Sequence, residues 1–201
     1  MSSDQILAHL GRDTQLAPHL NAVHWLETDP VPNVYHRLLR AICGQQLSVK
    51  AAATIWGRFV AHYGDAPPSP TELLDTEISV LRSVGLSGQK AGYVRNIATY
   101  FLDRPTDSVH WLSQTDDYIL RELTGIKGVG VWTVEMLLLF GLQRPDVFPV
   151  GDLGIQRGMQ QVYGLTETGK ALKARMVEIA EQWRPYRSFA TRTLWRVKDG
   201  D

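Results

Sequence analysis

The stretch "LTGIKGVGVWTVEMLLLF", Leu123 to Phe140, decides the fold prediction because it places three glycines directly before a strongly apolar run. Glycine costs a helix interior about 1 kcal/mol relative to alanine, so Gly125, Gly128 and Gly130 are unexpected where a helix is about to begin. The segments on either side, "DDYILREL" and "VWTVEMLLLF", both have helical patterns, and the spacer "TGIKGVG" is too short for a strand. We therefore predict a helix–hairpin–helix over residues 123–135, with the glycines supplying the turn.

The same glycines give the hairpin a candidate binding role. Without Cβ atoms, Gly128 and Gly130 let backbone N–H groups approach a partner closely, and Lys127 adds a positive charge beside them. N–H groups at the start of a helix, aligned with its dipole, bind phosphate well. An ordinary connection with a C-cap glycine is the alternative, but three glycines in six residues favour phosphate binding. Such contacts hold a duplex without reading its sequence.

The rest of the chain also has helical periodicity, so the predicted fold class is all-α. Ser48, Ser69 and Thr115 each stand where a helix N-cap is expected. No alternating apolar and polar run longer than about four residues argues for a strand. The apolar face of one predicted helix is Tyr35, Leu38, Leu39 and Ile42, and that of another is Ala91, Val94, Ile97, Ala98 and Phe101.

Composition excludes several classes of protein. The 201 residues include 21 basic and 21 acidic side chains, so net charge predicts neither a nucleic-acid nor a membrane partner. The longest apolar run, Met136–Phe140, is far shorter than the roughly 20 residues of a membrane span, and we expect a cytoplasmic protein. A single cysteine, Cys43, excludes an internal disulfide and a Cys-rich metal site, and we expect it to be a buried structural thiol.

Asp152, in "DVFPVGDLGIQRG", is the second candidate site residue. It precedes a helical pattern, and the simplest interpretation is an N-cap. It also lies about 20 residues after the hairpin, across one helix of roughly 18 Å, where a carboxylate could face DNA held by that hairpin. Both interpretations stay open on the sequence alone.

Three segments together resemble a known family. "GVGVWTVEMLLLFGLQRPDVFPVGDLGIQRG" is similar to the helix–hairpin–helix, Gly/Pro-rich loop and aspartate signature of the HhH-GPD base-excision glycosylases. "ICGQQLSVKAA" (42–52) and "WRPYRSFATRTLW" (183–195) resemble the 3-methyladenine DNA glycosylase II (AlkA-type) branch. The resemblance runs from about residue 34 to residue 196.

This resemblance implies a two-lobed helical fold with the active site in the cleft between the lobes. Residues 1–201 would form a single catalytic unit, with about 40–140 as the middle lobe and the N-terminal and C-terminal helices as the second lobe. The longer relatives carry an extra N-terminal β-rich domain, which we expect this chain to lack. We also expect a monomer.

The resemblance also implies the chemistry, with Asp152 as the catalytic aspartate. Lyase branches place a Schiff-base lysine where this chain has Trp132, and the four-cysteine iron–sulfur motif of other branches is missing. The implied activity is monofunctional: hydrolysis of the N-glycosidic bond of alkylated bases such as 3-methyladenine and 7-methylguanine, without strand cleavage. Asp152 would stabilise an oxocarbenium-like sugar or orient the attacking water. No metal or organic cofactor is implied; a monovalent cation at the hairpin loop stays open.

Trp132 and Trp195 match family positions that line the base pocket, where stacking contributes about 1–3 kcal/mol per base. The alternative for each is a core tryptophan. Met136, one helical turn after Trp132, would share the pocket wall, and it stands where the best-known relative has a tyrosine. Lesion preference is therefore not fixed by the sequence.

Gln46, in "GQQLS", matches the family position that wedges into the duplex gap. The alternative is that Gln45 and Gln46 only bond nearby backbone. Arg187 and Arg192 lie in a C-terminal run of basic residues that would contact phosphates or form a solvated face.

The predicted partner is double-stranded DNA that contains damaged bases, with nucleoid association if the source is bacterial. Two other functions stay open. One is a non-catalytic DNA-binding module that uses only the hairpin, and the other is a glycosylase for deaminated or etheno bases.

Overall fold

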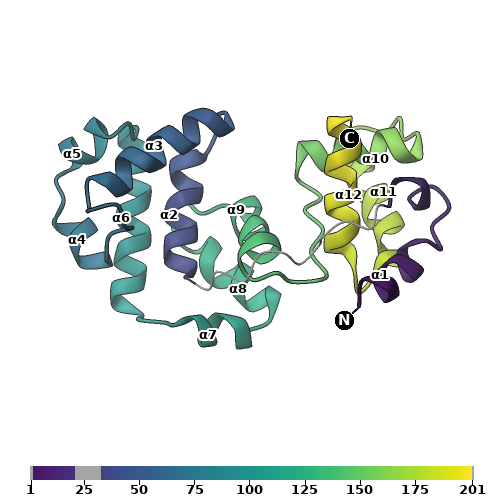
Figure 1. Ribbon diagram of the computed structural model, residues 1–201, viewed down its shortest axis with the longest axis horizontal. Coiled ribbons are helices and arrows are strands. Elements are labelled where there is room, and N and C mark those ends of the chain that lie inside the picture. The colour runs from purple at the N-terminus through teal and green to yellow at the C-terminus, as the bar shows by residue number, and fades with distance from the viewer. Residues whose placement is uncertain (1, 21–32, 201) are drawn as a thin grey trace. The chain divides into compact units, whose positions relative to one another are not determined.

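Helices supply all the regular secondary structure in the computed structural model over residues 2–20 and 33–200, which are the residues it describes (Figure 1). The prediction of an all-α fold is confirmed. Within the same residues, no helix is long and apolar enough to cross a membrane.

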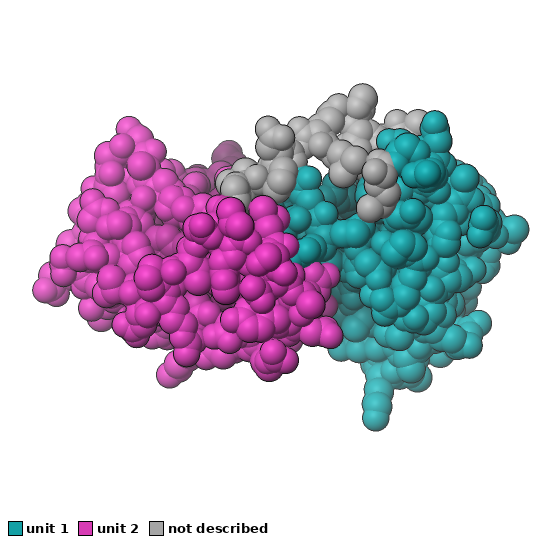
Figure 2. Space-filling view, turned by 90° about the horizontal axis from the view of Figure 1, so that it is seen from below, with its two compact units in different colours: residues 1–30, 138–201 teal, residues 31–137 magenta. Residues whose placement is uncertain are grey.

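The chain forms two compact units (Figure 2). Unit 1 contains residues 1–30 and 138–201, and unit 2 contains residues 31–137. The sequence placed the middle lobe at about 40–140 and the two ends of the chain in the other lobe. That the two units act as one catalytic module stays a prediction.

Unit 2 is built around α6, which packs against α2, α4 and α5. Its helices are α2 (Val34–Gly44), α3 (Val49–Ala61), α4 (Pro70–Asp75), α5 (Ile78–Ser83), α6 (Gly88–Asp103), α7 (Ser108–Ser113), α8 (Asp116–Thr124) and α9 (Val131–Met136). The predicted caps are confirmed, because the side chains of Ser48, Ser69 and Thr115 accept hydrogen bonds from the first turns of α3, α4 and α8. The predicted apolar faces of α2 and α6 are buried.

Cys43, in the last turn of α2, has no exposed surface, as predicted. Burial raises the pKa of its thiol to about 12, so the thiolate is scarce at neutral pH. The structural role expected of this residue is consistent with that environment.

Unit 1 joins the N-terminal segment to the C-terminal helices. Its elements are α1 (Ser3–Leu10), η1 (Ala17–His19), α10 (Leu153–Tyr163), α11 (Gly169–Ala180), η3 (Glu181–Trp183) and α12 (Arg187–Asp199). α10 and α12 approach closely at Gly158, where a Cβ atom would lie 2.5 Å from the carbonyl oxygen of Leu194. From the N-terminal segment, Ile6, Leu10 and Leu16 are buried in the same core as α10, α11 and α12.

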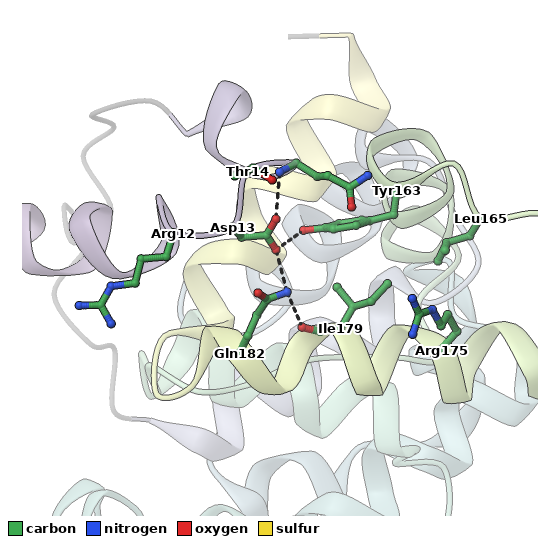
Figure 3. Close-up of a pocket in the computed structure, with 9 residues that line it drawn as sticks. Arg12, Asp13, Thr14, Tyr163, Leu165, Arg175, Ile179 and Gln182 are labelled. Atoms are coloured by element: carbon green, nitrogen blue, oxygen red, sulfur yellow. Dashed lines mark hydrogen bonds between the residues drawn. The ribbon is translucent and has the colours of Figure 1, made fainter.

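Asp13 ties the N-terminal segment to this core through a buried carboxylate (Figure 3). Its Oδ2 accepts from Tyr163 Oη at 2.7 Å, Trp183 Nε1 at 2.9 Å and Gln182 Nε2 at 3.0 Å. Its Oδ1 accepts from the backbone N–H groups of Gln15 and Leu16. Burial raises the pKa of Asp13, but the hydrogen bonds that the carboxylate accepts outweigh burial and leave that pKa below its ordinary value.

The apolar run after the hairpin departs from the prediction. A single α-helix was expected through Phe140, but α9 ends at Met136 and a π-helical turn, η2 (Leu137–Gly141), follows. The carbonyl oxygens of Leu138 and Leu139 accept from Arg144 N at 2.9 Å and Arg192 Nη2 at 3.1 Å. Because these donors come from outside the helix, the carbonyls of Leu138 and Leu139 are hydrogen-bonded even though the α-helical i to i−4 hydrogen bonds do not continue.

Candidate active site

Asp152 lies at the N-terminus of α10, at the end of the turn "PVGD" (149–152). Its backbone N–H donates to the carbonyl of Pro149 at 2.9 Å, and its extended backbone ends the loop. Its Oδ1 accepts from the N–H of Ile155 at 2.9 Å. The predicted N-cap is therefore present, and the cap holds a half-buried carboxylate at the positive end of an 11-residue helix.

A second donor holds the same oxygen. Trp195, on α12, donates its indole N–H to Asp152 Oδ1 at 2.9 Å. Gly154 makes this approach possible, because a Cβ atom there would lie 2.9 Å from Trp195 Cδ1 and 3.0 Å from Asp152 Oδ1. The orientation of the carboxylate is thus set by two helices of unit 1.

The ring of Trp195 is supported by Phe140 from η2. The two rings stack with centroids 5.7 Å apart and planes inclined by 19°. The guanidinium of Arg192 lies 5.3 Å from the Phe140 centroid, within cation–π range. Because η2 carries Phe140, the π-helical turn is linked to Asp152 through Trp195.

The two predicted phosphate-contacting arginines have partners inside unit 1. Arg187 is 15% exposed, and its Nε donates to Asp146 Oδ1 at 2.7 Å. Arg192 is half-buried, where it contacts Phe140 and the Leu139 carbonyl. These contacts give both side chains structural roles, and their contact with phosphate stays a prediction.

The hairpin belongs to unit 2, and the two helices predicted on either side of its glycine turn are present as α8 and α9. Gly128 has φ +107°, and a Cβ atom there would lie 2.2 Å from Tyr93 Cγ, so this glycine is required by the packing of the turn itself. Gly130 is the N-cap of α9 and has open space at the Cβ position. Among the described residues, no backbone carbonyl accepts a hydrogen bond from the N–H of Gly128 or Gly130. Lys127 is exposed beside them.

The predicted base-pocket residues are divided between the units. Trp132 and Met136 lie on α9 in unit 2, and Trp195 lies in unit 1 with Asp152. Trp132 is 47% exposed, which disfavours the alternative of a core tryptophan. Met136 is half-buried. A pocket formed by all of these residues stays a prediction.

Gln46 is exposed and has φ +58°, an uncommon conformation for a residue other than glycine. The side chain of its neighbour Gln45 hydrogen-bonds to backbone, which was the alternative to a wedge role, because its Nε2 donates to the carbonyl of Gly128 at 3.3 Å. The two glutamines therefore differ: one is a structural link to the hairpin and the other is presented to solvent.

Two residues make contacts beside candidate site residues that the sequence did not lead us to expect. Phe140 was expected to continue the helix after the hairpin, and in the structure it lies in the π-helical turn, where its ring stacks on Trp195. Lys90, on α6, donates to the carbonyls of Cys43 and Gln45, at the end of α2 before Gln46. No local pattern marks either residue, since each contact joins segments more than 40 residues apart.

Comparison with known proteins places these motifs in one family. The family model described as HhH-GPD superfamily base excision DNA repair protein matches residues 39–185. The DNA-3-methyladenine glycosylase 1 of Schizosaccharomyces pombe is 35% identical over 168 residues, which cover 81% of this chain and 72% of that protein. A putative DNA-3-methyladenine glycosylase of Bacillus subtilis is 31% identical, and the match covers 82% of this chain but 58% of that protein.

A solved structure agrees with this assignment. The Schizosaccharomyces pombe 3-methyladenine DNA glycosylase in complex with abasic DNA superposes with a TM-score of 0.81 at 28% identity, and the match covers 97% of each chain.

Proposed function

The chain belongs to the HhH-GPD superfamily of base excision DNA repair proteins, and from that premise we propose that it is a monofunctional DNA glycosylase that releases alkylated bases from double-stranded DNA. The observation that carries the proposal is the doubly held carboxylate of Asp152, at the aspartate position of the family motif. Similar proteins named as DNA-3-methyladenine glycosylases support the choice of lesion.

The chemistry follows from the substrate. A purine alkylated at N3 or N7 is cationic, so its bond to C1′ is already weakened. As that bond breaks, its electron pair moves to the base, which leaves neutral, and positive charge develops on the sugar. The fixed anion of Asp152 stabilises that charge electrostatically, or it accepts the proton of the water that attacks C1′. A rigid carboxylate needs little reorganisation at the moment of reaction, which is what its two donors provide.

Trp132, Trp195 and Met136 are proposed to hold the extruded base. Trp132 is 47% exposed, so part of its surface is accessible to an extruded base, and a cationic base adds a cation–π contribution of about 0.5–2 kcal/mol. Met136 offers a polarizable, adaptable wall. These contributions offset the few kcal/mol that extrusion costs, which is smallest for damaged pairs.

The route ends at an abasic site. Strand cleavage by a covalent lyase route needs an amine, and Trp132 has none at the position where the lyase branches keep lysine. We propose that the reaction needs no metal or organic cofactor. A monovalent cation at the hairpin loop remains compatible with the turn.

We propose that the backbone amides of Gly128 and Gly130, with Lys127 beside them, bind the phosphates of the DNA. The side chain of Gln46 is proposed to insert into the gap that the extruded base leaves in the duplex. Arg187 and Arg192 would add charge near the backbone of the duplex. We propose a monomer in the cytoplasm, associated with the nucleoid if the source is bacterial.

A lesion panel tests the proposal. Duplexes carrying 3-methyladenine, 7-methylguanine, a deaminated base or an etheno base are incubated with the protein, and the released base is identified. We expect release of the alkylated purines and an intact strand until alkali is added. If the protein releases only deaminated or etheno bases, it is a glycosylase for those lesions and the proposed specificity for alkylated purines is wrong.

Binding measurements distinguish the glycosylase from the rival function, a non-catalytic DNA-binding module. It predicts no base release and equal affinity for undamaged DNA and DNA with an abasic analogue. A glycosylase binds the abasic analogue more tightly, because that site resembles its product.

A further inference from the structure

The loop that carries Gln46, residues 45–48, adopts a conformation that its own sequence does not favour. Gln46 has φ +58° in a loop without glycine. Left-handed backbone is unfavourable for residues with a Cβ atom and persists where the surroundings determine it. Within the loop, the N–H of Leu47 donates to the carbonyl of Gly44 at 3.2 Å, which closes a tight turn directly after α2.

Lys90 holds this loop from α6. Its ammonium donates to the carbonyl of Gln45 at 2.8 Å and to the carbonyl of Cys43 at 3.0 Å. The last turn of α2 contains no basic residue of its own, so Lys90 supplies the positive charge that the carbonyl end of a helix favours. Burial lowers the pKa of Lys90, which agrees with an ammonium turned towards the protein.

The same side of α6 also holds the hairpin. Tyr93 packs against Gly128, and Asn96 Nδ2 donates to the carbonyl of Lys127 at 3.0 Å. Lys90, Tyr93 and Asn96 are three residues apart, so they lie on one side of the helix. Gln45 closes the connection, because its Nε2 donates to the carbonyl of Gly128 at 3.3 Å. Two loops that are distant in sequence are therefore fastened to one helix and to each other.

We propose that Lys90 is a positioning residue that fixes Gln46 relative to the hairpin. This inference rests on the proposed function: the hairpin binds the backbone of the duplex while Lys90 keeps Gln46 oriented towards the base-pair gap. Lys90 then acts on extrusion of the base through Gln46 and does not need to touch DNA itself.

The test compares Lys90→Met with Lys90→Arg on two substrates under single-turnover conditions. One duplex carries 7-methylguanine opposite cytosine, and the other carries it opposite an abasic analogue, where no pair must be broken. Because extrusion costs most when an intact pair must be broken, we expect Lys90→Met to slow release about tenfold on the first duplex and about twofold or less on the second. Lys90→Arg, which keeps donors for both carbonyls, should recover most of the rate.

Controls separate this role from folding and from direct DNA contact. Lys173→Met removes an exposed lysine of α11 and should leave both rates unchanged. Gln45→Leu removes the hydrogen bond to Gly128 but keeps Lys90. It should slow release more on the paired duplex than on the duplex with the abasic analogue, as Lys90→Met does. This variant keeps the proposal testable if Lys90→Met folds poorly. Equal slowing on both duplexes, or no slowing on either, would overturn the proposal.

A second readout does not depend on base release. A 2-aminopurine next to 7-methylguanine paired with cytosine becomes more fluorescent when the protein breaks that pair and extrudes the damaged base. The wild type should raise this signal and Lys90→Met should not, at protein concentrations that saturate both. If the wild type opens the duplex but releases no base, the proposed activity is wrong while the role of Lys90 is still decided by the fluorescence of the variant.

Discussion

Trp195 donates its indole N–H to Oδ1 of Asp152 at 2.9 Å, and this bond joins α12 to the start of α10. The oxygen is also the N-cap acceptor for Ile155. One carboxylate oxygen is therefore committed to the fold, which fixes the direction of the whole group. The tryptophan predicted to line a base pocket is also the residue that orients the proposed catalytic anion.

Trp195→Phe is expected to slow base release without weakening DNA binding. Phenylalanine keeps a ring that can stack on Phe140 but lacks the N–H. A hydrogen bond to a charged group contributes about 1.5–3 kcal/mol, so the single-turnover rate should fall about tenfold to a hundredfold. The dissociation constant for abasic-analogue DNA should stay within about twofold. A rate like that of the wild type would mean that the bond does not serve the reaction.

Gly128→Ala should destabilise the protein much more than Gly130→Ala does. The Cβ position of Gly130 is open, so its substitution should lower the free energy of unfolding by less than about 1 kcal/mol. Gly128 has φ +107° and lies against Tyr93, so its substitution should cost at least about 2 kcal/mol.

DNA binding distinguishes a phosphate-binding hairpin from an ordinary turn. If phosphates approach the amide of Gly130, the added methyl group should weaken duplex affinity about tenfold while the fold stays intact. Denaturant unfolding and fluorescence anisotropy with a labelled duplex measure the two quantities. Unchanged affinity of folded Gly130→Ala would argue against a close backbone contact there.

Asp13→Asn should destabilise the protein, because the carboxylate accepts hydrogen bonds from five groups. An amide replaces one acceptor oxygen with a donor that faces other donors, and we expect a loss of about 2–4 kcal/mol. Asp75→Asn, at the exposed end of α4, is the matched control and should change stability by less than about 0.5 kcal/mol.

The contribution of Asp13 should depend on pH in a defined direction. Its folded-state pKa is lowered, so the carboxylate stabilises the fold at every pH above its unfolded pKa of about 3.9. As the pH falls below about 4, the difference in unfolding free energy between wild type and Asp13→Asn should shrink. A difference that stays constant down to pH 2 would contradict the assignment of Asp13 as a buried, charged acceptor.

Local signals predicted most of the fold. Caps and apolar spacing located α2, α3, α6 and α8, because a helix needs both a satisfied first turn and one buried face. The same signals missed α5 and α7, which are six residues each and too short to show periodicity. The turn from α9 into η2 was also missed, since donors from Arg144 and Arg192 decide it.

The sequence indicated candidate site residues where a family motif is contiguous, and it did not indicate contacts between distant segments. Asp152, Trp132 and the hairpin lie in one stretch and were identified together. Phe140 and Lys90 act through packing and hydrogen bonds to distant segments, and a single sequence contains no record of those contacts. For Arg187, the basic run predicted phosphate contact but not the ion pair with Asp146 inside unit 1, and the phosphate contact stays a prediction.

Asp152→Asn separates the charge of Asp152 from its structural role, because asparagine is as good an N-cap as aspartate and its amide oxygen can still accept from Ile155 and Trp195. The variant should keep its free energy of unfolding within about 0.5 kcal/mol and its affinity for abasic-analogue DNA within about threefold. Only the negative charge is removed. The measurement is the single-turnover rate of 3-methyladenine or 7-methylguanine release from duplex DNA. We predict a fall of at least about a hundredfold, and release at the wild-type rate by this folded variant would contradict the assignment of Asp152 as the catalytic anion.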